Sequence, residues 1–490
     1  MLLRHSAIYL FARVIPSMLS LLGIAIYTRM LGPEDYGLYA LVVSGAGLAQ
    51  VWFFEWLRLS TLRFLPQFDE RRAALTSSLA AGFLIAAGVA GILAFGALPL
   101  FRGTMPSGML EIGVLLLWAQ GLFGVTAAMT WADLAPRRFV VMALSSSVLM
   151  LGLSVLGLSL GFGPIALVAA LTVAYSVAVI PPLAREWPRI RLRDADRALI
   201  WRCWRYGLPL SLASGFGLVV MTSDRFMIAW LLDTGAAGGF AAAYELARHP
   251  IGALLGVVSQ AAVPLAINRL ERAGADAARV QLQQNLALLL AIGLPATVGL
   301  ALVADDLVAI VLGAEFREAA AALIPWIALA ALLHGITAHH FNVAFQLAQT
   351  TAPMACISIM AALLNLALNY WWIQSLGVVG AAYASVVTYV FAMTCSVIWG
   401  RRAFALPRPD SELFKVAGAT ALMAAAVWAV PTPASAWALG VRVLTGAVVY
   451  GAAIWALDLG GIRAGLRNRI RGVWSRHARR RGPERSPTDA

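Results

Sequence analysis

Residues 223–260 read SDRFMIAWLLDTGAAGGFAAAYELARHPIGALLGVVSQ, and this stretch decides the fold. It joins the end of one apolar run to most of the next through a short glycine-rich turn. Apolar runs of about 20 residues, long enough to cross a bilayer, recur along the whole chain. The chain is 61% hydrophobic and 12% charged, whereas soluble proteins carry about 25% charged residues. The sequence therefore predicts an all-α polytopic membrane protein.

The apolar runs and the residues that break them predict about fourteen transmembrane helices. These helices are expected near residues 6–30, 36–57, 75–100, 108–132, 139–160, 164–184, 207–232, 238–264, 282–304, 319–345, 353–374, 378–399, 413–431 and 436–458. They divide the chain into an N-lobe of six helices (1–184), a basic linker (185–206), a C-lobe of six helices (207–400), two further helices (401–460) and a basic tail (461–490). The linker is expected to be either an interfacial amphipathic helix or a simple connection. The tail either binds anionic headgroups or only fixes the topology.

The arginines fix the expected orientation. If the N-terminus is cytoplasmic, the cytoplasmic segments hold 30 of the 37 basic residues, and the outer segments hold only Arg29, Arg102 and Arg317. The positive-inside rule then places both termini in the cytoplasm. Topology therefore accounts for the net charge of +13, and no nucleic-acid partner is needed to explain it.

An internal repeat supports two matching lobes. The stretch LGPEDYGLYA at 31–40 aligns with LDTGAAGGFA at 232–241, with the first leucine, a glycine, an aromatic residue and the final alanine in common. Each copy joins an outgoing helix to an incoming one, and an even number of predicted helices separates the copies. The two lobes should therefore be parallel repeats, related by an axis along the membrane normal.

These motifs resemble those of a known family. LGPEDYGLYA after the first helix, Asp224-Arg225 before the second glycine-aromatic turn, and Asn365, Asn369 and GVVGAAYA at 377–384 resemble the polysaccharide-transporter branch of the multidrug/oligosaccharidyl-lipid/polysaccharide (MOP) exporter superfamily, the Wzx-type flippases. Asp233 departs from the glycine that many relatives have after the leucine. The resemblance implies two MATE-like six-helix lobes around a cavity that opens alternately to each side of a bacterial inner membrane. It also implies undecaprenyl-pyrophosphate-linked oligosaccharide as the cargo.

Basic residues within the predicted helices are the candidate substrate contacts. Because a charge at the centre of a spanning helix costs roughly 2.5–3.5 kcal/mol, such a residue usually faces a partner or a wet cavity. Arg248 either contacts the pyrophosphate or forms a structural pair with Glu245, one helical turn away. Arg13 either meets the headgroup or snorkels to the interface. The full set of candidate substrate-binding residues is Arg13, Arg225, Arg248, His249, His339 and His340.

Three carboxylates are candidates for ion coupling. Asp224 either binds a coupling ion or makes a hydrogen bond between helices, Glu245 is paired or coupling, and Glu55 is a candidate proton carrier. The sequence has no nucleotide-binding loop and no nucleophile elbow, so neither a cofactor nor catalysis is expected. The three cysteines are far apart and the histidines around His334 do not share one helix face, so no metal site is expected. Coupling to H⁺ or Na⁺ is the expected source of energy.

The leading hypothesis is a flippase for lipid-linked polysaccharide repeat units, working beside membrane lipid and together with a polysaccharide polymerase and a chain-length regulator. Within the superfamily, the alternatives are a flippase for the peptidoglycan lipid precursor and a cation-coupled drug exporter. Arginines within the helices disfavour the exporter, because organic cations would need carboxylates. A membrane polymerase or ligase is a more distant alternative, since every predicted outer connection is short.

Overall fold

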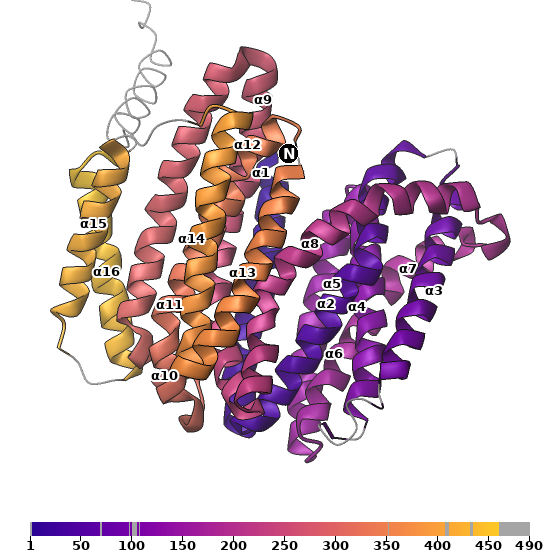
Figure 1. The fold of residues 1–490 in the computed structure, drawn as a ribbon, viewed down its shortest axis with the longest axis horizontal. Coiled ribbons are helices and arrows are strands. Elements are labelled where there is room, and N and C mark those ends of the chain that lie inside the picture. Colours follow the sequence, from indigo (N-terminus) through magenta and orange to yellow (C-terminus); the bar gives the residue numbers. More distant parts are fainter. Residues whose placement is uncertain are drawn as a thin grey trace, which may run out of the picture.

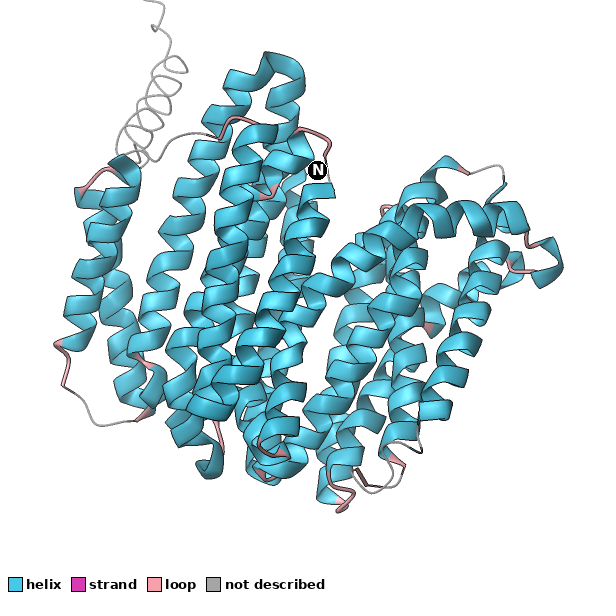
Figure 2. Ribbon diagram, viewed as in Figure 1, coloured by secondary structure: helices cyan, strands magenta, loops and turns pink. Residues whose placement is uncertain are grey.

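A computed structural model describes residues 2–68, 71–97, 99, 105–106, 108–350, 352–406, 411–431 and 435–459, with the side chains of the first helix from Ile15 onward. The regular structure of these residues is helical, without a β-strand (Figure 2). Two groups of helices stand side by side, most of the N-terminal half in indigo and magenta and the C-terminal half in rose, orange and yellow, and the first helix, labelled α1, lies in this view with the second group (Figure 1). The tail at 461–490 lies outside the described residues.

The N-terminal half contains seven of the described helices. Proline occupies the first turn of α2, α5 and α6, where its missing N–H has no partner to lose and its fixed φ suits the helix. The helices are α1 (Leu2–Met30), α2 (Pro33–Phe64), α3 (Arg72–Ala97), α4 (Met109–Ala132), α5 (Pro136–Ser159), α6 (Pro164–Ala178) and α7 (Ile180–Glu186).

The C-terminal half is built around a long hairpin. Its helices are α8 (Arg197–Leu231), α9 (Thr234–Leu302), α10 (Ala304–Val311), α11 (Arg317–Ile336), the π-helical η7 (Thr337–Phe341), α12 (Val343–Leu347), α13 (Ala352–Leu376), α14 (Val378–Ala403), α15 (Ser411–Trp428) and α16 (Ala436–Ala456). The α9 segment doubles back at Gly274, whose φ is 83°. The Asn285 side chain therefore donates to the Ala262 carbonyl at 3.1 Å, and α9 supplies two of the expected membrane passes.

The helices match the predicted membrane fold. Eleven helices among the described residues are long and apolar enough to cross a membrane. The second half of α9, the shorter apolar part of α1 and α15 bring the passes to the predicted fourteen. The prediction of an all-α polytopic membrane protein is confirmed.

The repeated turns cross each other at the end of the molecule opposite the arginine-rich side. A Cβ atom on Gly37 would lie 1.9 Å from the Thr234 carbonyl oxygen, and one on Gly238 would lie 2.0 Å from the Pro33 oxygen. Pro33 and Gly37 align with Thr234 and Gly238 in the sequence repeat, so the two contacts are reciprocal. The α2 and α9 backbones approach each other this closely because both crossing positions are glycine. The repeat therefore forms the closed junction between the lobes.

The α8 helix connects the two lobes. It begins at Arg197, before the predicted start at 207, because the Asp196 carboxylate accepts from the Ala198 N–H at 2.7 Å and caps the helix. Near its start, the Cys203 carbonyl accepts from Ser60 of α2 at 2.8 Å. Farther along, α8 packs on α13, and Figure 1 shows it running obliquely from one half to the other.

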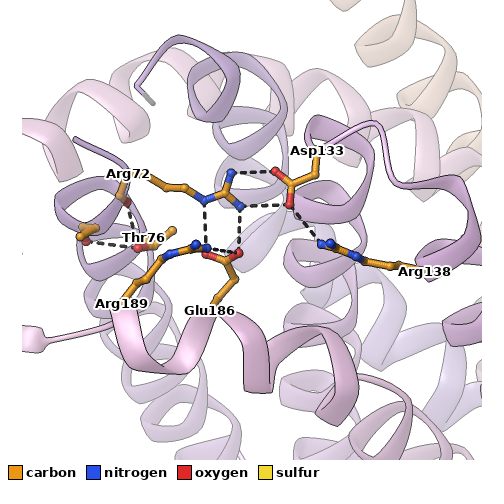
Figure 3. A network of polar contacts seen from close by, with 7 residues as sticks. Arg72, Thr76, Asp133, Arg138, Glu186 and Arg189 are labelled. Carbon is orange, nitrogen blue, oxygen red and sulfur yellow. Dashed lines mark hydrogen bonds and ion pairs between the residues drawn. The ribbon is translucent and has the colours of Figure 1, made fainter. Parts of the chain in front are cut away.

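A charged network ties the start of the linker to the N-terminal half (Figure 3). Arg72 of α3 donates to both oxygens of Asp133, at 2.7 and 3.0 Å, and to Glu186 of α7 at 2.9 Å. Arg189 donates to Glu186 at 3.0 Å, and Arg138 lies 3.6 Å from Asp133. Arg72 contacts both carboxylates, so it joins the ends of α3, α4 and α7. Its side chain is only 19% exposed.

We expect Arg72→Ala to destabilise the protein by about 3 kcal/mol, because it leaves two largely buried carboxylates without their shared partner. Arg189→Ala is the matched control. The Arg189 side chain is 52% exposed, so its loss should cost under about 1 kcal/mol. Thermal unfolding of the detergent-solubilised protein measures both effects, and equal midpoints for the two variants would contradict the assignment.

Candidate functional site

A cavity between the two halves contains most of the candidate residues. It has a deep chamber of about 370 Å³ and an adjoining chamber of about 520 Å³. The two chambers share Pro16 of α1, Ser147 of α5, Tyr175 of α6 and His249 of α9. Both halves of the chain therefore contribute to one space, and charged side chains such as Arg225, Glu245 and Arg248 lie in its wall.

The deep chamber is lined by tyrosines and closed at its far end. Tyr27, Tyr36, Tyr39 and Tyr175 all contribute to its wall. Two residues beyond Tyr27, the Arg29 guanidinium donates to the carbonyl groups of Ile310 and Val311 at the end of α10. These hydrogen bonds join α1 of the N-terminal half to α10 of the C-terminal half. A tyrosine presents an apolar ring together with a hydroxyl group, and a wall of this kind suits the apolar faces and hydroxyl groups of sugars.

An ion pair crosses the deep chamber. Arg225 of α8 donates to Glu245 of α9 at 2.9 Å and to Ser44 of α2 at 2.9 Å. The second Glu245 oxygen lies 3.3 Å from Nδ1 of His249, and the Arg225 guanidinium lies 4.8 Å from the centre of the Tyr244 ring. Arg225 therefore links α2 of one half to α8 and α9 of the other, and its charge is balanced by Glu245.

Arg248 lines the other chamber, and no carboxylate of the described residues lies within ion-pair distance of it. Its Nη2 lies 3.0 Å from the Met221 sulfur, and its guanidinium lies 5.5 Å from the Tyr244 ring. Glu245, which is one turn away on α9, pairs with Arg225 and His249 instead. His334 and His339 line the same chamber. This chamber therefore presents a guanidinium without a balancing carboxylate, which suits a phosphate or pyrophosphate.

Asp224 lies in a separate polar cluster inside the C-terminal half. Its side chain is fully buried and accepts from Asn369 of α13 at 2.6 Å and from Ser385 of α14 at 2.8 Å. Asn369 also donates to Asn365 at 3.1 Å, and its own side-chain oxygen has no hydrogen-bond partner within the described part of the chain. Asp224 therefore accepts from neutral side chains and forms no ion pair with Arg225, its neighbour in sequence, which pairs with Glu245 instead.

The remaining candidate residues lie outside the cavity wall. His340 is 1% exposed and packs against Phe341. Glu55 accepts from Arg58 within α2 and lines neither chamber. The Arg13 side chain lies outside the described residues. Of the predicted substrate contacts, Arg225, Arg248, His249 and His339 therefore lie together in the cavity.

The sequence reasoning missed the tyrosine wall. Tyr36 and Tyr39 lie within the first repeat copy, and a wall of tyrosines requires the packing of α1, α2 and α6 around one space. For the Asp224 cluster a signal was present, because Asn365 and Asn369 are four residues apart and share one helix face. Two amides on one face of an apolar helix indicate a buried polar contact.

The chain resembles solved transporter structures over most of its length. It matches a structure described as the lipid II flippase MurJ in an inward closed conformation, with a TM-score of 0.78 and 13% identity over 92% of this chain and 99% of that one. An inward-facing multidrug resistance MATE family transporter of the MOP superfamily gives a TM-score of 0.65 and 17% identity over 80% and 97%. A MOP superfamily transporter from Pyrococcus furiosus gives a TM-score of 0.59 and 17% identity over 82% and 94%.

At sequence identities this low, likeness to solved structures shows only that the fold is shared. Membership of a family is shown instead by a match to the sequence profile of that family. No curated protein sequence matches the chain. The profile described as "Polysaccharide biosynthesis protein" matches residues 26–321, more than half of the chain. The chain therefore belongs to the polysaccharide biosynthesis protein family.

Proposed function

We propose that this protein is a flippase that moves undecaprenyl-pyrophosphate-linked oligosaccharide units across the bacterial inner membrane. The observation that carries the proposal is the two-chamber cavity. One chamber holds the Arg248 guanidinium, which has no carboxylate partner among the described residues, and the other holds the tyrosine wall. Arg248 would hold the pyrophosphate, and the deep chamber would hold the sugars. The polyprenyl tail would remain in lipid, outside the cavity.

Transport would proceed by movement of one half of the chain against the other. In the described conformation the halves meet at the Gly37–Gly238 crossing and through Arg29. Cargo would enter from the arginine-rich side, which we assign to the cytoplasm together with both termini. Separation of the crossing would then release the cargo on the periplasmic side. A polymerase and a chain-length regulator would act on the released units.

Asp224 is the proposed coupling group, and H⁺ or Na⁺ is the proposed ion. A fully buried carboxylate with only neutral hydrogen-bond partners is costly in its charged form, so a bound proton or cation would stabilise it. We expect Asp224→Asn to weaken the response of transport to an imposed ion gradient by about tenfold. Gradient-driven flipping in proteoliposomes measures this loss.

Asp276→Asn is the matched control for the coupling experiment. It makes the same change at a carboxylate that is 93% exposed, pairs with Arg279 at 2.7 Å and lines neither chamber, so it should leave the gradient response intact. A wild-type response in the Asp224→Asn variant would remove Asp224 from the coupling role.

The proposed cargo is tested in proteoliposomes that contain the purified chain and a labelled lipid-linked oligosaccharide. We expect the protein to make the inner-leaflet fraction of the label accessible to an external sugar-modifying reagent. A polyprenyl lipid that carries the same sugar on a neutral linkage should be moved poorly, because it lacks the anion for Arg248. Equal movement of both lipids would contradict the assigned headgroup.

A flippase for the peptidoglycan lipid precursor is the second candidate. Its specific support is the pair of helices after the two lobes, α15 and α16, which are anchored by a 2.6 Å ion pair between Arg442 and the buried Asp306. The likeness to the MurJ structure extends over 92% of the chain. Both cargoes share a pyrophosphate, so the cavity arginine fits either. The same proteoliposomes loaded with lipid II separate the two, and we expect slower movement of lipid II than of the polysaccharide unit.

A further inference from the structure

A second, apolar groove lies on the N-terminal half, away from the central cavity. It has a volume of about 1130 Å³ and lies between α2, α3 and the first turns of α8. This volume is slightly above the roughly 300–1,000 Å³ of ordinary ligand pockets. The groove shares no lining residue with either chamber of the central cavity. It is therefore a separate site among the described residues.

The wall of the groove is suited to a hydrocarbon chain. Trp52 and Trp56 of α2 form its inner side, and Ile85 and Val89 of α3 form its edge. Ile85 is 60% exposed and Val89 is 46% exposed, although both lie within a helix that is apolar and long enough to cross a membrane. The groove therefore opens sideways toward the bilayer, and the molecules that reach it from that direction are lipids.

The mouth of the groove carries a cationic side chain. Arg197, in the first turn of α8, lines it. Asp196 also lines the mouth, but its carboxylate caps α8 through the Ala198 N–H at 2.7 Å. An arginine at the edge of an apolar groove complements the charge of an anionic headgroup, and such a residue contributes about 1 kcal/mol at a charged membrane surface.

Tryptophans place this mouth at the boundary between membrane and water. Trp201 and Trp204 of α8 line the groove and stack with ring centres 4.9 Å apart. Both are exposed, at 58% and 38%. Exposed tryptophans beside arginines are typical of the headgroup level of a bilayer. The headgroup level and the apolar groove are therefore adjacent on the arginine-rich side.

We propose that this groove binds an anionic glycerophospholipid, with an acyl chain along Ile85 and Val89 and the phosphate at Arg197. The bound lipid lies between the N-terminal half and the start of α8. Farther along, the same helix carries Asp224 and Arg225, so the lipid fixes the position of the helix that joins the halves. This site is additional to the cargo cavity, and it stands whether or not the cavity carries a lipid-linked sugar.

Native mass spectrometry of the full chain in detergent tests the proposal, with phosphatidylglycerol and phosphatidylcholine added in equal amounts. We expect the wild type to retain phosphatidylglycerol about fivefold more than phosphatidylcholine. Arg197→Glu should lower phosphatidylglycerol retention by about tenfold, because it replaces an attraction with a repulsion. Val89→Trp should fill the groove and lower the retention of both lipids.

Two control variants make the result specific to the groove. Arg193→Glu changes the same charge in the neighbouring segment, at a side chain that is 77% exposed and outside the groove. Ile92→Trp adds the same bulk on α3, at a residue that is 76% exposed and also outside it. Both controls should retain lipid like the wild type.

Three outcomes would overturn the proposal. Equal retention of the two lipids by the wild type would mean that the groove has no headgroup preference. Equal losses in Arg193→Glu and Arg197→Glu would mean that only the net charge matters. The third outcome is that undecaprenyl phosphate displaces phosphatidylglycerol from the wild type but does not bind to Val89→Trp. That result would assign the groove to a polyprenyl chain instead.

Discussion

Replacement of Arg248 by alanine is expected to lower the flipping rate of the lipid-linked oligosaccharide by about 100-fold, while the protein remains folded. A charge-assisted contact between a guanidinium and a phosphate, once desolvated in a cavity, costs about 2–5 kcal/mol to truncate. Arg248 has no carboxylate partner among the described residues, so its removal leaves no opposite charge unpaired in the protein. The loss should therefore appear in transport and not in stability.

The flipping assay in proteoliposomes, together with thermal unfolding in detergent, separates these two effects. Arg248→Lys keeps the charge but loses the planar fork that contacts two phosphate oxygens at once, so we expect an intermediate loss of about tenfold. Arg272→Ala is the matched control, because this arginine is exposed elsewhere on α9 and lines neither chamber. Full activity of Arg248→Ala would remove Arg248 from the proposed site.

The second large effect is expected at the crossing of the two repeat copies. A single methyl group at Gly238 would lie 2.0 Å from the Pro33 carbonyl oxygen, so Gly238→Ala forces α2 and α9 apart. The junction would then fail to close, and we expect flipping to fall by at least about tenfold, because a conformation required in the cycle is no longer populated. Elsewhere in a helix, glycine to alanine is usually favourable by about 1 kcal/mol, so a loss here would be specific to the crossing.

A thiol probe in the deep chamber reports whether the junction is open. Tyr27 lines that chamber, and the Tyr27→Cys substitution is introduced after the native cysteines Cys203, Cys356 and Cys395 have been replaced. We expect Gly238→Ala to increase its labelling by a membrane-impermeant reagent from outside the cell. Gly239→Ala is the adjacent control, since its methyl group would meet Ala319 at an ordinary 3.8 Å. Unchanged labelling in Gly238→Ala would contradict a closed junction at this position.

Local signals in the sequence were sufficient to predict the membrane fold. Apolar length, the glycine turns and the proline helix starts are properties of short segments, and the repeat at 31–40 and 232–241 predicted the matching lobes. The structure also shows what Asp233 does at the position where glycine was expected. Its carboxylate accepts from the Ala236 N–H at 2.7 Å and caps α9. The start of α8 could not be placed correctly, since the Asp196 cap lies in a polar segment that reads as a linker.

The arrangement of the site depended on packing between distant helices. Glu245 and Arg248 are one helical turn apart on α9, so the sequence allowed an ion pair between them. In the structure Arg225 of α8 pairs with Glu245 at 2.9 Å, and Arg248 lines the cavity. The sequence identified these charges, yet only the approach of α2, α8 and α9 decides which of them pair. The tyrosine wall was missed for the same reason, because tyrosines are common in apolar helices and their convergence is not a local property.

The central claim is that this protein carries lipid-linked oligosaccharide to the outer leaflet, and the sidedness of that lipid in cells tests it most directly. Cells depleted of the protein are treated with an impermeant reagent that labels the sugar of undecaprenyl-linked units. We predict that the units accumulate out of reach of the reagent, and that restored expression of the wild type, but not of Arg248→Ala, exposes them again. Normal exposure of the units in depleted cells, with only the finished polymer missing, would contradict the flippase and favour a polymerase or ligase.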